Sequence, residues 1–279
     1  MIDLHLHTTA SDGRSSPQEL VREAASAGLT TIAVTDHDTT GAVDAVASGA
    51  RALGLNTIPG IEITAIHGGR DVHILAYFIR TEREDLALFL ARQQIERRRR
   101  LFEMIAALER GGVPIDRDAL DSRLARESMK SVGRPFLAQE LIRAGHVRSM
   151  SEAFERYLGE GRPGYVPRRG ATPREVIELV ARANGLTSLA HPGKLKWDEI
   201  LPDLVEAGLP AIEIHHPDHD AVDVGRYRHF ASRYGLLVTG GSDYHGPGSG
   251  RTAGLGRVTL DRADFDRLIE RAGWPGSSS

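Results

Sequence analysis

The chain has 279 residues, of which 41% are hydrophobic and 26% charged, as is ordinary for a soluble protein with a sizeable core. It contains no cysteine, which excludes disulfides, thiolate metal sites and a cysteine nucleophile, so any metal must be bound through nitrogen and oxygen. The formal net charge of −3 combines a basic middle, residues 92–169, with acidic flanks, which suggests an anionic ligand between cationic and carboxylate-rich parts. No apolar run approaches membrane-spanning length and the first predicted strand begins directly after Met1, so we expect a cytoplasmic protein.

The first predicted strand carries ionisable side chains at alternate positions. Asp3, His5 and His7 alternate with Ile2, Leu4 and Leu6. Side chains two apart on a strand point to the same face, so the two imidazoles project together. The strand alone is also compatible with a polar face turned to solvent, and the rest of the chain has to decide.

After this strand the chain alternates helices and strands, which predicts a parallel sheet. Ser16, Pro17 and Glu19 form a capping box that begins a helix, and Gly28 ends it. A second helix is predicted at about residues 41–53. The predicted strands lie at residues 31–35, 57–63 and 71–78. Gly68 and Gly69 precede the last of these, so this connection resembles a hairpin more than a crossover.

The strand pattern disappears in the middle of the chain. One long helix is predicted from Glu82 to Arg110, and shorter helices follow at residues 116–125, 134–144 and 151–158. We therefore predict a helical insertion, residues 99–168, in a barrel formed by residues 1–98 and 169–279. A second capping box at Thr172 begins the return to helices and strands. Further strands are predicted at residues 187–190, 211–215 and 236–239, and a last strand and helix within residues 257–273.

Nearly every predicted strand ends in an ionisable residue. In a parallel barrel the carboxyl ends of the strands form one mouth, so these side chains should converge there. A single histidine at a strand end is more commonly a structural residue. Ionisable residues at the ends of nearly all predicted strands are hard to attribute to chance. The candidate ligands are His5, His7, Asp12, His37, Glu62, His73, His191, Asp243 and His245. Nine ligands exceed what one ion can take, and mixed imidazole and carboxylate suits Mn, Zn or Fe better than Mg or Ca. His215, His216 and His219 fit the ligand pattern less well, and we expect them around the ligands or at the surface.

These motifs, in this order, resemble those of the PHP (polymerase and histidinol phosphatase) family of metal-dependent hydrolases. The matching segments are His5–His7 with Asp12, Thr35–His37, Gly60–Glu62, His73, Ala190–Pro192 and Gly241–His245. The resemblance implies an α/β fold, a distorted (β/α)7 barrel, with a centre of two or three divalent ions, Mn first and Zn or Fe as alternatives. By this resemblance His5, His7, Glu62 and Asp243 would hold one ion, Glu62, His73 and His191 a second, and Asp12, His37 and His245 a third.

The catalytic residues expected on this basis are His191, Asp243, His245, Asp12 and His37. Closely spaced ions can stabilise the attacking and leaving oxygens of a displacement at phosphorus. A water molecule bridging the ions, with its pKa lowered by them, would be the nucleophile, so no protein nucleophile is needed.

The insertion bears on the substrate. Arg97 to Arg100 can be a solvated helix face. On the helical period Arg97 and Arg100 lie near one face while Arg98 and Arg99 point elsewhere, so only one or two of the four can reach a ligand. We take Arg99 or Arg100 as the candidates. The segment with Lys130 and Arg134 is the better anion candidate, because backbone amides at a helix start lie beside two cations there. The alternative is a basic loop with a helix cap.

The insertion also resembles that of short family members acting on nucleoside 3′,5′-bisphosphates and on short 5′-phosphorylated single-stranded RNA. It would anchor the 5′ phosphate while the ions act on the 3′ phosphate. Two alternatives stay open: a phosphatase for a small monoester such as histidinol phosphate, and a nonenzymatic metal module of a polymerase-like assembly. We expect no membrane partner and no obligate protein partner.

Overall fold

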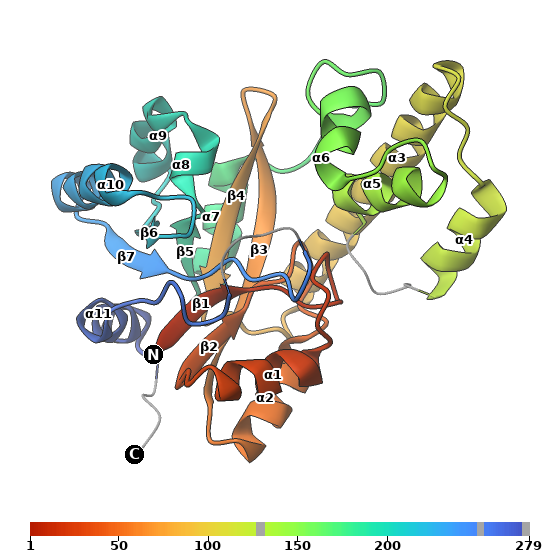
Figure 1. Ribbon diagram of the computed structural model, residues 1–279. Helices are drawn as coiled ribbons and strands as arrows, with labels where there is room; N and C mark the ends of the chain where they lie inside the picture. Colours follow the sequence, from red (N-terminus) through yellow and green to blue (C-terminus); the bar gives the residue numbers. More distant parts are fainter. Residues whose placement is uncertain (127–131, 250–253, 275–279) are drawn as a thin grey trace.

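The computed structural model describes residues 1–126, 132–249 and 254–274. In these residues a seven-stranded sheet follows the chain order, each strand pairing with the next (Figure 1). The strands are β1 (Ile2–Leu6), β2 (Thr31–Val34), β3 (Asn56–His67), β4 (Arg70–Tyr77), β5 (Leu186–Leu189), β6 (Ala211–His215) and β7 (Leu237–Gly240). Leu6 forms a bridge to Tyr244, just after β7, so the first and last strands meet and the sheet is nearly closed. The predicted α/β barrel is confirmed.

The hairpin predicted between the third and fourth strands is also confirmed. Gly68 and Gly69, both with positive φ, form its turn, and β3 and β4 pair antiparallel from Gly60 opposite Tyr77 to His67 opposite Arg70. β4 runs antiparallel to β5 as well, whereas the other neighbouring strands are parallel. The beginning of β4 therefore lies at the same mouth as the ends of the other strands.

Helices cover the outside of the barrel. α1 (Pro17–Ser26) and α7 (Pro173–Arg182) each begin with the predicted capping box, which satisfies free backbone amides of the first turn. Figure 1 shows α1 beside α2 (Val43–Ala52) on the outer side of β1 and β2. The remaining helices of this part are α8 (Pro192–Leu195), α9 (Leu201–Glu206), α10 (Ala221–Tyr234) and α11 (Arg262–Ala272).

The prediction of a last strand within residues 257–273 is wrong. Leu260 makes a single isolated bridge to Ile2, and the chain then enters α11. β1 pairs with β2 on one side, and on the other side Leu6 bridges to Tyr244, so Leu260 shares that edge with the segment after β7 and bridges only to Ile2.

The middle of the chain forms a helical layer beside the barrel mouth (Figure 1). It contains α3 (Glu84–Arg110), α4 (Arg117–Arg126), α5 (Arg134–Arg143) and α6 (Met150–Ala153), which continues in a π-helical turn, Phe154–Leu158. Leu86 and Leu90 of α3 pack in the barrel core, whereas Leu101 and Leu108 of the same helix pack in a second core inside the insertion. The boundary predicted near residue 98 thus falls within one continuous helix. No helix in the described ranges is long and apolar enough to cross a membrane.

Candidate metal centre

All nine candidate ligands converge at one mouth of the barrel. They come from β1 and the loop after it, from the segments after β2, β5 and β7, and from within β3 and β4. His73 lies near the beginning of its strand rather than at the end, and it reaches the mouth because β4 runs in the opposite direction. Most of these side chains are buried, and His73 and Asp12 are the most accessible among them.

Glu62 lies at the centre of the group and is fully buried. Its two oxygens face different sets of imidazoles. Oε1 is 2.8 Å from His73 Nδ1 and 3.0 Å from His191 Nε2, and Oε2 is 3.1 Å from His37 Nδ1, 3.3 Å from His7 Nε2 and 3.4 Å from His5 Nε2. One carboxylate can therefore serve two cation positions, as the bridging role expected for it requires.

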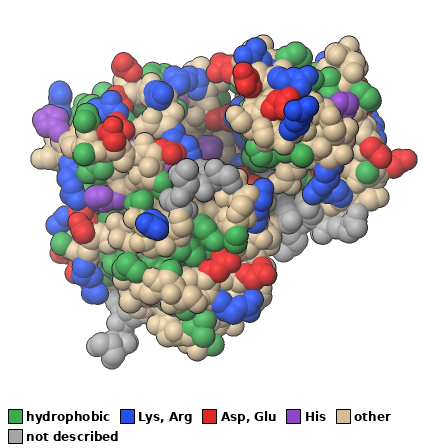
Figure 2. Space-filling view, viewed as in Figure 1, with side chains coloured by type: hydrophobic (Ala, Val, Ile, Leu, Met, Phe, Trp, Pro, Cys, Tyr) green, Lys and Arg blue, Asp and Glu red, His purple; other side chains and the backbone are tan. Residues whose placement is uncertain are grey.

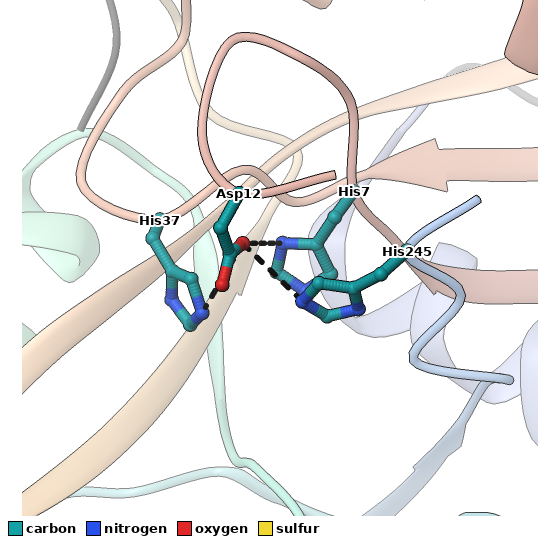
Figure 3. Close-up of side chains that lie close together, drawn as sticks. All are labelled: His7, Asp12, His37 and His245. Carbon is teal, nitrogen blue, oxygen red and sulfur yellow. Dashed lines mark ion pairs between the residues drawn. The ribbon is translucent and has the colours of Figure 1, made fainter. Parts of the chain in front are cut away.

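A second carboxylate, Asp12, faces the imidazoles of His7, His37 and His245 (Figure 3). Its Oδ1 is 3.2 Å from His245 Nε2, and 3.9 Å from both His7 Nδ1 and His37 Nε2. Neither ring nitrogen of His7 has a hydrogen-bond partner among the described residues, although the side chain is fully buried. Orphaned buried nitrogens are costly in a protein, and cations would satisfy them. The residues present therefore fit a metal centre.

The charges in the centre are those of a cation site. Burial raises the pKa of Asp12, but His245 and His37 outweigh it and hold that pKa well below its usual range. Burial, with Lys194 nearby, lowers the pKa of His191 to about 3, so this imidazole is neutral and free to bind an ion. Burial also lowers the pKa of His7, but the carboxylates of Asp243 and Glu62, each 3.3 Å from its Nε2, outweigh this effect and raise the pKa to about 9. Excess negative charge thus surrounds His7, and bound cations would offset it.

Glu213 in β6 contacts two of the candidate ligands and was not among the predicted site residues. It is fully buried, its Oε1 is 2.9 Å from His5 Nδ1, and its Oε2 accepts a hydrogen bond of 2.7 Å from the backbone N–H of His191. Burial raises its pKa, but the neighbouring His5 outweighs this effect and lowers the pKa to about 2. Such a carboxylate orients the imidazole of a ligand and raises its basicity. The only signal in the sequence was one acidic residue inside an apolar strand.

A cavity of about 210 Å³ connects the centre with the helical insertion. Its lining from the barrel includes Asp12, His37 and His73. Its lining from the insertion includes Arg134 and Arg168. Figure 2 shows a hollow between the barrel and the insertion, with histidine and basic side chains at its floor.

Both arginines form ion pairs with the same carboxylate oxygen of Asp71. Arg134 Nη2 and Arg168 Nε are each 3.5 Å from Asp71 Oδ2. Arg134 also lies 5.8 Å and 5.9 Å from the ring centroids of Phe154 and Tyr165. Burial and the nearby Arg97 lower the pKa of Arg168 to about 9, so it keeps its charge at neutral pH. Arg168 was not among the predicted residues, because nothing distinguishes it from Arg169 in the sequence.

Of the other predicted anchors that the structure describes, neither Arg99 nor Arg100 is among the residues that line this cavity, although Arg100 lies near the same Tyr165 ring as Arg134. Arg99 pairs with Glu96 and Glu103 on the surface of α3 and is not among the residues that line the cavity. Arg100 is buried, and its Nε donates a hydrogen bond of 2.7 Å to the carbonyl of Val166. Lys130 lies outside the described residues.

The chain is similar to one family of proteins and to several known proteins. The model of the PHP domain matches residues 3–159. A 3′,5′-nucleoside bisphosphate phosphatase from Chromobacterium violaceum is 31% identical over 89% of this chain and 88% of the relative, and the 5′-3′ exoribonuclease Rnm of Salmonella typhimurium is 34% identical over 88% and 85%. A phosphoribosyl 1,2-cyclic phosphate 1,2-diphosphodiesterase from Eggerthella lenta is 35% identical over 88% and 94%. A solved structure from Bifidobacterium adolescentis, described as a metal-dependent phosphoesterase, has a TM-score of 0.88 and 32% identity, covering 97% of this chain and 96% of that one.

Proposed function

The chain belongs to the PHP family of phosphoesterases, and from this premise we propose that it hydrolyses the 3′ phosphate of nucleoside 3′,5′-bisphosphates. The products would be a nucleoside 5′-monophosphate and inorganic phosphate. One observation carries the proposal: a single cavity is lined both by ligands of the candidate metal centre and by Arg134 and Arg168. A nucleoside 3′,5′-bisphosphate carries two phosphates on one ribose, so one phosphate can bind at the metal centre and the other at the arginines.

The nine predicted ligands would hold two or three divalent ions, Mn first and Zn or Fe as alternatives. When bound, such ions lower the pKa of water and offset the charge on phosphoryl oxygens. The ions next to the reacting 3′ phosphate would be held by the expected catalytic residues, His191, Asp243, His245, Asp12 and His37. In the reaction a water oxygen bonds to phosphorus, the bond from phosphorus to the 3′ oxygen breaks, and that oxygen leaves as a hydroxyl after taking up a proton.

Arg134 and Arg168 would bind the 5′ phosphate. A guanidinium group matches phosphate because its planar fork can donate two parallel hydrogen bonds. Asp71 holds both guanidinium groups in place, and its own pKa is lowered: burial opposes ionisation, but Arg168 and neighbouring positive groups outweigh it. Phe154 in the cavity wall offers an apolar surface to the nucleoside.

Short 5′-phosphorylated RNA is a second candidate substrate. The bond cleaved at its first nucleotide also joins a 3′ oxygen to phosphorus, and cleavage again leaves a 5′-mononucleotide. The similarity to the Salmonella typhimurium exoribonuclease favours this candidate. The similarity to the Eggerthella lenta enzyme adds a competing substrate, a ribose 1,2-cyclic phosphate, which a test must include.

The test is phosphate and nucleotide release from a substrate panel, with Mn and with chelator. The panel contains adenosine 3′,5′-bisphosphate, 3′-AMP, 5′-AMP, histidinol phosphate, phosphoribosyl 1,2-cyclic phosphate and RNA oligomers with and without a 5′ phosphate. We expect the bisphosphate to give 5′-AMP with the highest kcat/KM, and chelator to abolish the reaction. Faster turnover of histidinol phosphate or of the cyclic phosphate would replace the proposed substrate, and activity unaffected by chelator would remove the metal-dependent mechanism.

A further inference from the structure

The loop after β6 supplies none of the nine predicted ligands, yet one of its histidines contacts a ligand directly. His216 is buried, and its ring lies edge-on to that of His191 with the centroids 5.4 Å apart. Its Nε2 is 3.2 Å from Asp243 Oδ2. Its Nδ1 is 3.0 Å from the backbone nitrogen of Asp218.

These two contacts fix the tautomer of His216. The backbone N–H of Asp218 can only donate, so Nδ1 must accept and carries no proton. In the neutral imidazole the proton is then on Nε2, which donates it to Asp243 Oδ2. The ring is thus a fixed donor aimed at one carboxylate oxygen.

The neighbouring histidine of the same loop keeps this ring in place. His219 packs against His216 with the ring centroids 5.3 Å apart. Its Nε2 accepts a hydrogen bond of 3.0 Å from the N–H of Gly193, and its Nδ1 is 2.8 Å from the carbonyl of Ile214. Both ring nitrogens of His219 are therefore engaged, so His216 has a rigid neighbour.

The two oxygens of Asp243 are consequently used differently. Oδ2 faces His216 and Lys194, at 3.2 Å and 3.3 Å. Oδ1 faces the ligand nitrogens, at 3.4 Å from His5 Nε2 and 3.3 Å from His7 Nε2. The backbone of Asp243 has φ of +49°, which is uncommon for a residue other than glycine, so the surrounding structure has to stabilise this backbone conformation.

We propose that His216 is a positioning residue that occupies Oδ2 of Asp243 and thereby reserves Oδ1 for the ion shared with His5 and His7. The proposal rests on the metal centre of the proposed function and not on its substrate. Partners that orient a ligand in this way commonly contribute about ten- to a hundredfold to metal affinity. Metal binding can be measured without substrate, so failure of the proposed substrate leaves this inference standing, and the reverse also holds.

Two variants separate positioning from simple structural support. In His216→Gln the side-chain amide lies where Nε2 was and can still donate to Asp243. In His216→Asn the side-chain oxygen lies where Nδ1 was and can still accept from the N–H of Asp218, but the donor to Asp243 is lost. Both variants remove the ring, so both should lower the stability of the metal-free protein by similar amounts.

The measurement is calorimetric titration of the metal-free full-length protein with Mn²⁺. We expect His216→Asn to weaken binding about ten- to a hundredfold and His216→Gln by less than about threefold. Lys194→Met, which removes another contact to Oδ2, should have a smaller effect than His216→Asn. Equal affinities for the two His216 variants, or a full loss in Lys194→Met with none in His216→Asn, would overturn the proposal.

The native protein gives an independent readout if a variant fails to fold. Nitrogen-15 NMR of the imidazoles distinguishes a protonated Nε2 from a protonated Nδ1. We expect His216 to be the neutral tautomer with the proton on Nε2, with and without Mn²⁺. A proton on Nδ1 would contradict the donor role.

Discussion

Glu62 is the side chain on which most of the centre depends, because five imidazoles surround its two oxygens. Glu62→Gln keeps the shape but removes the charge and leaves only one acceptor oxygen. We expect activity with Mn²⁺ to fall by more than about a hundredfold, since a bridging ligand matters more than a residue that only orients one. Phosphate release measured beside elemental analysis tests this. Glu178→Gln, on the exposed side of α7, is the matched control and should be unaffected; normal metal content in Glu62→Gln would contradict the bridging role.

For Glu213 we predict an effect on stability, because both groups that contact its carboxylate donate hydrogen bonds to it. The N–H of His191 and the Nδ1–H of His5 each need an acceptor, and glutamine offers only one. Glu213→Gln should therefore lower the free energy of unfolding of the metal-free protein by about 1 to 3 kcal/mol. Urea denaturation in chelator measures this value. An unchanged midpoint would show that the carboxylate does not support the two ligands.

At the residue scale, a functional side chain can be predicted from the sequence when it differs from the pattern of the residues around it. His5 and His7 are recognisable because imidazoles alternate with apolar residues on one strand. Glu213 and Arg168 are not, because their roles depend on partners far away in the chain, such as His5 and Asp71. Arg99 shows the opposite case, since its charge is paired within its own helix by Glu96 and Glu103.

At the scale of elements, α3 joins the insertion to the barrel through a buried ion pair. Arg97 Nε is 2.5 Å from Asp38 Oδ2, and its Nη2 is 3.0 Å from Thr64 Oγ1. Asp38 directly follows His37, so this pair links the helix to a predicted ligand. The helical period places Arg97 and Arg100 near one face of the helix. The structure buries both side chains and exposes Arg98, and the period could predict neither this burial nor the partner in a distant loop.

Breaking this pair should destabilise the protein strongly. Arg97→Met leaves the Asp38 carboxylate buried without its cation, and we expect the free energy of unfolding to fall by about 3 to 5 kcal/mol. The double variant Arg97→Met with Asp38→Asn should be less destabilised than the single one, because no charge is left uncompensated. Chemical denaturation of the three proteins gives the comparison. Additive losses would mean that the two side chains do not act as a pair.

The hairpin of β3 and β4 shows how an element changes the meaning of a position. The turn glycines are visible in the sequence and predict the reversal of the chain. That reversal brings the beginning of β4, with His73, to the mouth, where a strand-end rule for parallel strands does not place it. The absence of the predicted last strand also depends on the neighbouring elements. Leu260 has strand-like neighbours, but it shares the edge of β1 with the segment after β7 and makes only one bridge there.

At the scale of the whole molecule, cations bound at the mouth would link segments from six strands. Ligands that bind only the folded state stabilise it by mass action. We expect chelation to lower the melting temperature and abolish activity, and added Mn²⁺ to restore both. Calorimetry with parallel elemental analysis tests this. Full activity with fewer than two ions per chain would contradict the multinuclear centre.

The central claim is that one cavity holds both phosphates of one substrate, the 3′ phosphate at the metal centre and the 5′ phosphate at Arg134. The most direct measurement is kcat/KM of the wild type and of Arg134→Ala with adenosine 3′,5′-bisphosphate and with 3′-AMP, with Arg169→Ala, an exposed arginine, as the control. A charge-assisted hydrogen bond contributes roughly 1.5 to 3 kcal/mol, so Arg134→Ala should lower kcat/KM about ten- to a hundredfold for the bisphosphate. It should change kcat/KM for 3′-AMP by less than about twofold, because 3′-AMP has no 5′ phosphate to lose contact with. Equal losses for both substrates, or a wild type that does not prefer the bisphosphate, would contradict the account.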